Sequence, residues 1–389
     1  MKKKLVWGSV TLVLAVLALV HWVLPGYVER SMNVVSSAEL PEIRPEIAML
    51  HQRLFIADLH ADSLLWKRDL LKRSRTGHVD LPRLQEGNVA VQVFSAVTKS
   101  PSGLNYASNT AESDDITLLA VLSMWPLHTW DSLFERTVYQ LQKLDRFAQR
   151  SDEQLVVVRS KAEFAEYLKR RLSGEKVVAG LFMIEGAHPL EGDIENLDRL
   201  FDQGLRFAGL THFFDNELGG SLHGVSGAGL SEFGRKVIKR SNQLGIIIDV
   251  AHASPAMVRD VLAVTTRPVI LSHGGLRGAC DSQRNLSDEL MRELADNGAL
   301  LGVGYWPGAV CEATPAAIVR TIRYAIDLMG IQNVALGSDF DGTVETPFDT
   351  SNLAQLTQEM VDTGFTEREI RLVMGENVRR FLMLNLPNR

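Results

Sequence analysis

Side chains that can bind metal ions recur at the ends of apolar segments along this chain. Five segments carry them: Asp58-Leu59-His60-Ala61-Asp62, Ile184-Glu185-Gly186, Asp249-Val250-Ala251-His252, Leu271-Ser272-His273 and Gly337-Ser338-Asp339. Imidazole nitrogens and carboxylate oxygens are ordinary zinc ligands. When β-rich runs in a βα pattern end in such residues, the side chains meet at the catalytic face of a barrel. The set therefore predicts a metal-dependent hydrolase.

The spacing indicates how these residues could share the binding of metal ions. At strand spacing His60 and Asp62 point to the same side, which suits chelation of one ion. His252 and His273 are 21 residues apart, one βα repeat, and together could hold a second ion. Glu185 ends an apolar run, where a carboxylate needs a partner, and it could bridge both ions. Singly, each histidine fits a packed core or surface residue and Glu185 a structural ion pair, so the prediction depends on the set.

The elements that would position these residues follow a βα order. Eight apolar runs are predicted as strands: Leu54–Leu59, Val89–Val97, Val177–Ile184, Phe207–Thr211, Ile246–Val250, Val269–Ser272, Ala299–Gly304 and Val334–Ser338. Amphipathic helices are predicted at Ser231–Leu244, Pro255–Val264 and Pro315–Met329. With 389 residues and 46% apolar content, we expect an α/β fold, a (β/α)8 TIM-type barrel of the metal-dependent hydrolase kind.

Further segments lie between or after the predicted barrel units. Asp114–Arg150 is predicted to be a long helical insertion, and Leu155–Val158 a short extra strand outside the barrel. The polar stretches Lys99–Ser113 and Leu218–Gly229 follow strands, so they are expected on the catalytic face, as substrate walls or as solvated loops. Thr366–Leu384 is predicted to be a terminal helix outside the barrel.

The N-terminus has the pattern of a transmembrane or signal-anchor helix. Lys2, Lys3 and Lys4 precede the apolar stretch from Leu5 to Leu24, which is long enough to span a bilayer. The positive-inside rule predicts a bacterial-type inner-membrane anchor with the catalytic domain exported, or secreted if the segment is cleaved near Ser36-Ser37-Ala38. The alternative is a buried core helix. We therefore divide the chain into an anchor at 1–25, a tether at 26–50 and a barrel domain at 51–389.

Charge and cysteine content exclude other classes. The formal net charge of −6 and the pI near 6.0 leave no basic footprint, so no nucleic-acid partner is expected. Cys280 and Cys311 lack the CxxC spacing of a structural zinc site. Whether the two cysteines pair with each other is left open.

The ordered segments resemble the membrane dipeptidase, or renal dipeptidase, family of amidohydrolase-like barrels. The resemblance runs from about Leu54 to Gly342 and includes DLHAD, IEGAH, LTHFFDN, DVAHAS, LSHGG, RNLSD and GSDFDG. It implies two zinc ions per subunit. One would be held by His60 and Asp62 and the other by His252 and His273, with Glu185 bridging them and no carbamylated lysine.

The same resemblance assigns three catalytic or substrate-binding roles. His212 would stabilise the oxyanion of the tetrahedral intermediate, where the alternative is a packed histidine. Arg284, followed by Asn285, would bind the free carboxylate of the substrate rather than form a surface salt bridge. Asp339 would carry the proton from the hydroxide to the leaving amine rather than cap a helix, and Asp341 is the less suitable candidate.

These roles imply hydrolysis of dipeptides by a hydroxide bridging two zinc ions, with tolerance of a C-terminal D-residue. The family also suggests a homodimer. One alternative is a related amidohydrolase acting on N-acyl amino acids, lactams or lactones, and another is a non-catalytic, membrane-tethered binding protein. The seventh strand departs from the family's Asn-Phe-Tyr-like ending, since it reads Val303-Gly304-Tyr305-Trp306-Pro307, and this is expected to reshape the pocket. His188 and His223 receive no ligand role, and Asn216 is a candidate substrate contact.

Overall fold

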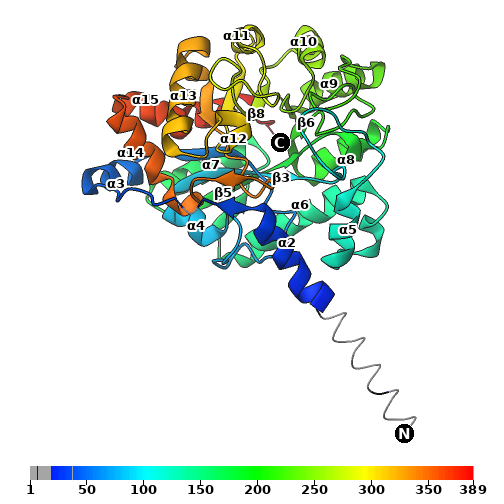
Figure 1. Ribbon diagram of the computed structural model, residues 1–389, viewed down its shortest axis with the longest axis horizontal. Coiled ribbons are helices and arrows are strands. Elements are labelled where there is room, and N and C mark those ends of the chain that lie inside the picture. Colours follow the sequence, from blue (N-terminus) through cyan, green and yellow to red (C-terminus); the bar gives the residue numbers. More distant parts are fainter. Residues whose placement is uncertain (1–6, 8–18, 37, 389) are drawn as a thin grey trace.

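The computed structural model describes Trp7, residues 19–36 and residues 38–388. Its body is a ring of parallel strands surrounded by helices, and the helical residues 19–32, coloured dark blue, lie at the lower edge of this body (Figure 1).

Eight parallel strands close into the predicted barrel. They are β2 (Ile56–Ala61), β3 (Val89–Ala96), β5 (Val178–Ile184), β6 (Leu205–Gly209), β7 (Ile247–Asp249), β8 (Ile270–Gly274), β9 (Leu300–Val303) and β10 (Val334–Leu336). Each pairs with its neighbours in parallel, and the β10–β2 and β3–β5 pairings complete the ring. The TIM-type (β/α)8 fold is therefore confirmed, and all eight predicted strands are present.

The barrel strands are buried on both faces. Every residue of β2, β3, β5 and β8 is buried, because one face fills the barrel and helices cover the other. This double burial explains why the strands appear in the sequence as continuous apolar runs instead of alternating patterns.

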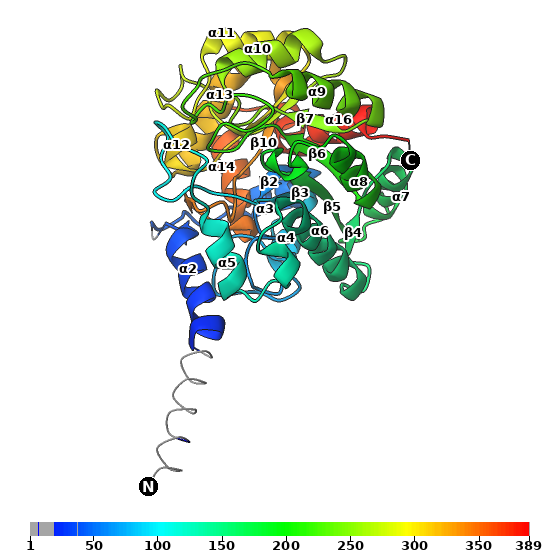
Figure 2. The ribbon, with the colours of Figure 1, turned by 90° about the vertical axis from the view of Figure 1, so that its right-hand side faces the viewer.

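Helices pack around the ring in the order expected of βα units (Figure 2). They are α4 (Leu81–Glu86), α6 (Leu133–Arg150), α7 (Lys161–Leu172), α8 (Glu195–Gln203), α9 (Glu232–Leu244), α10 (Pro255–Val264), α11 (Asp288–Asp296), α12 (Pro307–Val310), α13 (Pro315–Met329) and α14 (Ala354–Asp362). The three helices predicted from the sequence, now α9, α10 and α13, are confirmed. Ser254 caps α10 by accepting a hydrogen bond from the backbone of Met257.

The insertion after β3 is helical but divided. It consists of α5 (Asp115–Leu122), a short 3-10 turn (Leu127–Thr129) and α6. The extra strand is also present as β4 (Leu155–Val157), which pairs with the first half of β5.

The predicted C-terminal helix is broken into three pieces. It forms α15 (Glu367–Arg371), a π-helical turn (Leu372–Glu376) and α16 (Asn377–Asn385). A side chain at Gly375 would place its Cβ 2.2 Å from the carbonyl oxygen of Phe55. The break therefore lets the chain pass close to the backbone that leads into β2, a contact that periodicity alone does not reveal.

Most of the expected membrane anchor lies outside the described residues. Among the residues that the structure does describe, none of the helices combines the length and the apolar character needed to cross a bilayer. Within the expected tether lie most of α2 (Leu24–Met32), β1 (Val34–Val35) and most of α3 (Pro45–Gln52). Because β1 pairs with β11 (Glu345–Thr346), this segment adds structure to the barrel domain as well as linking it to the N-terminus. The division into anchor, tether and domain stays a prediction.

Candidate metal centre and active site

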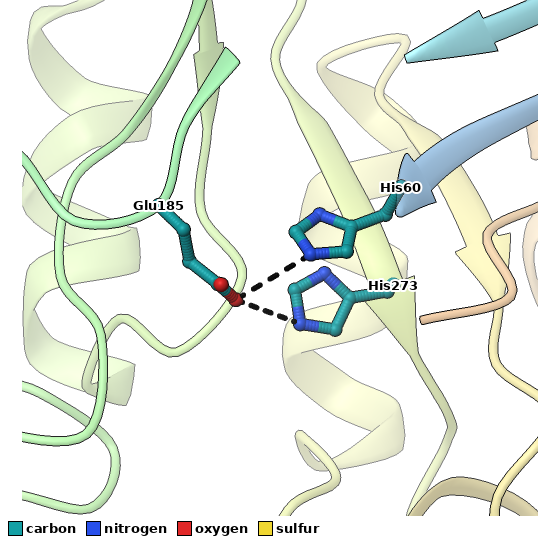
Figure 3. A group of neighbouring side chains, drawn as sticks. All are labelled: His60, Glu185 and His273. Carbon is teal, nitrogen blue, oxygen red and sulfur yellow. Dashed lines mark ion pairs between the residues drawn. The ribbon is translucent and has the colours of Figure 1, made fainter. Parts of the chain in front are cut away.

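The five predicted metal ligands lie together at the carboxyl-terminal ends of the strands. His60 lies in β2 with Asp62 just after it, Glu185 directly follows β5, His252 follows β7, and His273 lies in β8. Each is at most 4% exposed. Figure 3 shows the carboxylate of Glu185 directed at the imidazoles of His60 and His273.

Glu185 occupies the middle of this cluster. Its Oε1 lies 3.1 Å from Nε2 of His252, 3.4 Å from Nε2 of His273 and 3.7 Å from Nε2 of His60. Oδ1 of Asp62 lies 3.4 Å from Nε2 of His60. The rings of His60 and His273 are also close, with centroids 3.9 Å apart. How the ligands divide between two ions stays a prediction.

The cluster fits a metal ion by two tests. Ligand atoms about 2.1 Å from a tetrahedral zinc ion are about 3.4 Å from one another, which matches the separations above. In addition, both ring nitrogens of His60, Oδ1 of Asp62 and Oε2 of Glu185 are buried without a hydrogen-bond partner. Since buried polar atoms rarely lack partners, a cation is the partner that this chemistry fits.

The electrostatics of the cluster support the same reading. Burial raises the pKa of Glu185 well above its usual value, and the nearby Asp62 adds to this effect. Burial also raises the pKa of Asp339, to about 8, and lowers the pKa values of His252 and His273 well below their usual range. A bound cation favours ionised carboxylates and neutral imidazoles, so it would resolve the unfavourable burial of the carboxylates.

Two residues behind the ligands orient the ring of His273. Ser272 Oγ donates a hydrogen bond to Oδ2 of Asp249 at 2.6 Å and lies 2.9 Å from Nδ1 of His273. Because the hydroxyl hydrogen of Ser272 is used in the bond to Asp249, the Ser272 oxygen accepts a hydrogen bond from Nδ1–H of His273. Nε2 of His273 is then left with its lone pair for a metal. Sequence reasoning assigned no role to Asp249 or Ser272.

Two site residues have an unusual backbone conformation. His252 has φ 62° and Asp339 has φ 60°, in the left-handed region that few non-glycine residues adopt. The carbonyl of His252 accepts hydrogen bonds from Leu222 N at 2.7 Å and Thr211 Oγ1 at 2.9 Å. These bonds hold the turn that aims His252 into the cluster.

Arg284 reaches the pocket as expected, but Asn285 does not. The guanidinium of Arg284 lies 2% exposed beside the cluster and donates from Nη2 to the carbonyl of His273 at 2.9 Å. Asn285 is fully buried, and its amide donates to the carbonyls of Cys280 and Ala309 at 3.0 and 2.8 Å. The substrate contact expected at Asn285 stays a prediction, and in this structure its amide nitrogen instead holds two loops together.

The pocket above the cluster is small and has an aromatic wall. It is lined by Asp62, Glu185, His212, His252, Arg284, Asp339, Tyr106, Phe213, Trp306 and neighbouring loop residues. Its volume is about 110 Å³. One buried water needs roughly 10–15 Å³, so the space above the cluster is large enough for more than a single water. Trp306 Nε1 donates to the hydroxyl of Tyr106 at 2.8 Å.

The wall residue Tyr106 was missed by sequence reasoning, although its loop, Lys99–Ser113, was predicted to lie on the catalytic face. Trp306 belongs to the segment that departs from the family pattern. The carbonyl of Tyr106 lies 2.9 Å from Nδ1 of His223, so the two polar loops contact each other beside the pocket. These contacts favour the substrate-wall interpretation of the loops.

The other residues near the predicted site, His212, His188 and Asn216, make different contacts. His212 lines the pocket, with Nε2 3.6 Å from Oε2 of Glu185, and burial lowers its pKa to about 4. Nε2 of His188 is hydrogen-bonded to Oγ1 of Thr98 at 2.8 Å. The side-chain amide of Asn216 donates a hydrogen bond to the carbonyl of Leu210, in its own loop, at 2.8 Å. The candidate substrate role of Asn216 therefore finds no support in the geometry.

The two cysteines form a disulfide, Cys280–Cys311. This bond joins the loop that carries Arg284 to the loop that follows Trp306. The question that the sequence left open is thereby answered, and the bond braces one side of the pocket.

A parallel barrel with a buried cluster of histidines and carboxylates at its catalytic end defines a metal-dependent hydrolase. The sequence model of the membrane dipeptidase family (Peptidase family M19) matches residues 44–384. The chain belongs to this family, and it is a metallopeptidase that hydrolyses dipeptides.

Individual relatives agree with this membership. The chain is 28% identical over 355 residues to dipeptidase aclJ of Aspergillus oryzae, covering 85% of this chain and 78% of that protein. The probable dipeptidase PvdM from Pseudomonas aeruginosa shares the fold with a TM-score of 0.71 at 20% identity, covering 87% and 97% of the two chains. A metallopeptidase from Rhodobacter sphaeroides, liganded with a phosphinate mimic of L-Ala-D-Ala, shares it with a TM-score of 0.65 at 22% identity, covering 86% and 99%.

Proposed function

We propose that this protein cleaves dipeptides with two zinc ions held by His60, Asp62, His252 and His273 and shared through Glu185. The observation that carries the proposal is the central position of Glu185, whose Oε1 lies within 3.7 Å of three imidazole nitrogens. When bound, the ions would lower the pKa of a water to about 7 and polarise the substrate carbonyl.

Two side chains carry the acid–base and electrostatic work. Burial lowers the pKa of His212 to about 4, so its ring is neutral at pH 7. Donation of an N–H hydrogen bond to the oxygen that becomes negative in the transition state requires the tautomer with the hydrogen on Nε2, in place of the one in which Nδ1 donates to the carbonyl of Lys99 at 3.5 Å. Asp339 lines the pocket, with Oδ1 3.8 Å from Nε2 of His60. It accepts the proton of the attacking water and passes it to the leaving amine.

Arg284 selects a substrate with a free carboxylate. The guanidinium binds the free carboxylate that follows the scissile bond, since its donors match the two carboxylate oxygens. The pocket volume of about 110 Å³ is compatible with a small substrate such as a dipeptide. We also propose acceptance of a C-terminal D-residue, supported by the L-Ala-D-Ala mimic bound to the Rhodobacter sphaeroides relative.

We further propose that Leu5–Leu24 anchors the protein in a bacterial-type inner membrane with the barrel exported. Lys2 to Lys4 and the apolar stretch support this topology, and the Cys280–Cys311 disulfide suits an oxidising compartment. Cell fractionation with protease accessibility tests the anchor, since release into the soluble fraction with intact N-terminal mass contradicts it. Light scattering tests the homodimer suggested by the family.

The test of the activity uses the full chain. After chelation and zinc readdition, release of amino acids is measured on L,L and L,D dipeptides, an N-acetyl amino acid and a lactam, beside a Glu185→Gln control. We expect zinc-dependent turnover of dipeptides, two bound zinc ions per chain, and loss of both properties in the control. Turnover of the acyl amino acid or lactam alone, with zinc bound, would instead establish the alternative amidohydrolase.

A further inference from the structure

The segment just before the matched family region is mostly exposed, but two of its polar side chains are buried against the barrel domain. The family match begins at residue 44, yet Glu29 on α2 and Asn33 just after it are only 3% and 5% exposed. Glu29 Oε1 accepts a hydrogen bond from Nε of Arg68 at 2.5 Å. An acidic side chain is rarely buried unless it is paired, so this ion pair fixes α2 to the barrel domain.

Arg68 continues the connection toward the active site. Its guanidinium also forms an ion pair with Asp341, two residues after Asp339. Asp341 in turn accepts a hydrogen bond from Ser63 Oγ at 2.5 Å, and Ser63 directly follows the ligand Asp62. Hydrogen bonds of charged side chains therefore connect α2, through Arg68 and Asp341, to the segments that carry Asp339 and Asp62.

Hydrogen bonds from the side chains and the backbone of the same segment hold the loop at residues 339–346. Asn33 Oδ1 accepts from Thr343 N at 2.8 Å, and Val34 N donates to Val344 O at 3.0 Å. His78 completes the link, because its Nδ1 accepts from Asp341 N at 3.0 Å. Its Nε2 then carries the hydrogen and donates to Val34 O at 3.2 Å.

This loop is one wall of the pocket, and its backbone needs support. Gly342, Thr343 and Val344 line the pocket together with Asp339. Asp339, Asp341 and Thr343 have φ of 60°, 64° and 62°, which is unfavourable for side-chain-bearing residues. Such a conformation persists only where the surroundings hold it. Three hydrogen bonds to the loop come from residues 33–36: those of Asn33 and Val34, and one from Ser36 N to Thr346 O at 2.8 Å.

The other side of α2 faces a second part of the wall. Val28 packs against a buried cluster that contains Leu65, Val97 and Ile116. These three residues also line the pocket. Figure 2 shows α2 beside α5, which carries Ile116.

We propose that residues 28–36 are a positioning element of the active site, which fixes the 339–346 loop and with it Asp339. The proposal adds to the proposed function a part of the chain that the family match does not include. It makes the segment next to the expected anchor a part of the enzyme, so that release of the domain beyond residue 36 would disorder the pocket wall.

The test compares full-length variants. Glu29→Gln removes the charge that holds Arg68, and Asn33→Leu removes the acceptor for Thr343. Arg30→Gln is the matched control, because Arg30 lies on the same helix and is exposed. For each variant we would measure hydrogen exchange of the 341–346 amides, bound zinc, and kcat and KM on a dipeptide.

We expect loop exchange to rise and kcat/KM to fall by about tenfold or more in Glu29→Gln and Asn33→Leu, the order expected for losing a hydrogen bond to a charged or buried group. Bound zinc and the control should stay at the wild-type level. Loop exchange equal to that of Arg30→Gln in both variants would overturn the proposal. If the wild type cleaves no dipeptide, the proposed function fails, and the exchange measurement still decides the role of the segment.

Discussion

Replacing Arg284 tests how the pocket recognises its substrate. The guanidinium is 2% exposed, lines the pocket and lies 5.6 Å above the ring of Trp306. One donor atom, Nη2, already holds the carbonyl of His273. A bidentate pair with a substrate carboxylate adds two charged hydrogen bonds at about 1.5–3 kcal/mol each. We therefore expect Arg284→Met to lower kcat/KM for a dipeptide by about 10²–10⁴, since 1.4 kcal/mol is a factor of ten.

The assay compares two enzymes on two substrates, in the manner of a double-mutant cycle. The wild type and Arg284→Met are each measured on a dipeptide and on the same dipeptide with an amide in place of its carboxylate. The wild type should prefer the free acid, and the variant should treat the two substrates alike. Arg284→Lys should recover only part of the preference, because lysine keeps the charge but lacks the planar fork. An equal loss on both substrates, with the preference intact, would refute the assigned contact and leave Arg284 a structural role.

Three other substitutions test separate parts of the account. Asp339→Asn should lower kcat by about 10²–10⁴ with bound zinc unchanged, measured by steady-state kinetics and metal analysis; loss of the zinc would contradict a proton-carrying role. His51 is buried against Thr357 and Gly87, and burial lowers its pKa from 6.5 to about 4. Its contribution to stability is present above pH 6.5 and falls as the pH drops toward 4, by about 2 kcal/mol between pH 7.5 and pH 5. Urea unfolding of His51→Gln should lack this part of the pH dependence, and an unchanged dependence would show that His51 is not responsible. Reducing the Cys280–Cys311 bond, 31 residues apart, should lower the free energy of unfolding by about 3–4 kcal/mol. The free energy of unfolding of a Cys280→Ser/Cys311→Ser variant should not change with reductant. If reductant lowered it as much as in the wild type, the effect would not come from this disulfide.

The barrel could be predicted because its physics is local. Strands buried on both faces must be continuously apolar, so segments such as Val177–Ile184 are visible without any knowledge of their partners. Candidate metal ligands at strand ends are visible for the same reason, and His60, Glu185 and His273 lie together at the carboxyl-terminal ends of parallel strands. Helix starts such as Ser254-Pro255 depend on capping groups a few residues away.

The features that escaped prediction depend on distant contacts. Asn285 stands beside Arg284 in the sequence, but its amide is committed to the carbonyl of Ala309, 24 residues away. The break at Gly375 exists because the backbone of Phe55 passes close by. The burial of Glu29 depends on Arg68 and Asp341. No local pattern contains these partners, so composition alone made residues 26–50 look like a plain tether.

The closure of the barrel also governs when the enzyme can first work during its biosynthesis. The first and last strands of the ring are neighbours, and Ser338 Oγ donates to the carbonyl of His60 across 278 residues of sequence. A ribosome adding roughly 5–20 residues per second takes roughly 15–55 s to cover that distance. During this interval the nascent chain contains His60 and Asp62 but lacks β10 and the Asp339 that follows it. The ring of strands, and with it the cluster of predicted metal ligands, therefore cannot assemble until β10 has been made, and a chain that ends before β10 cannot close the barrel.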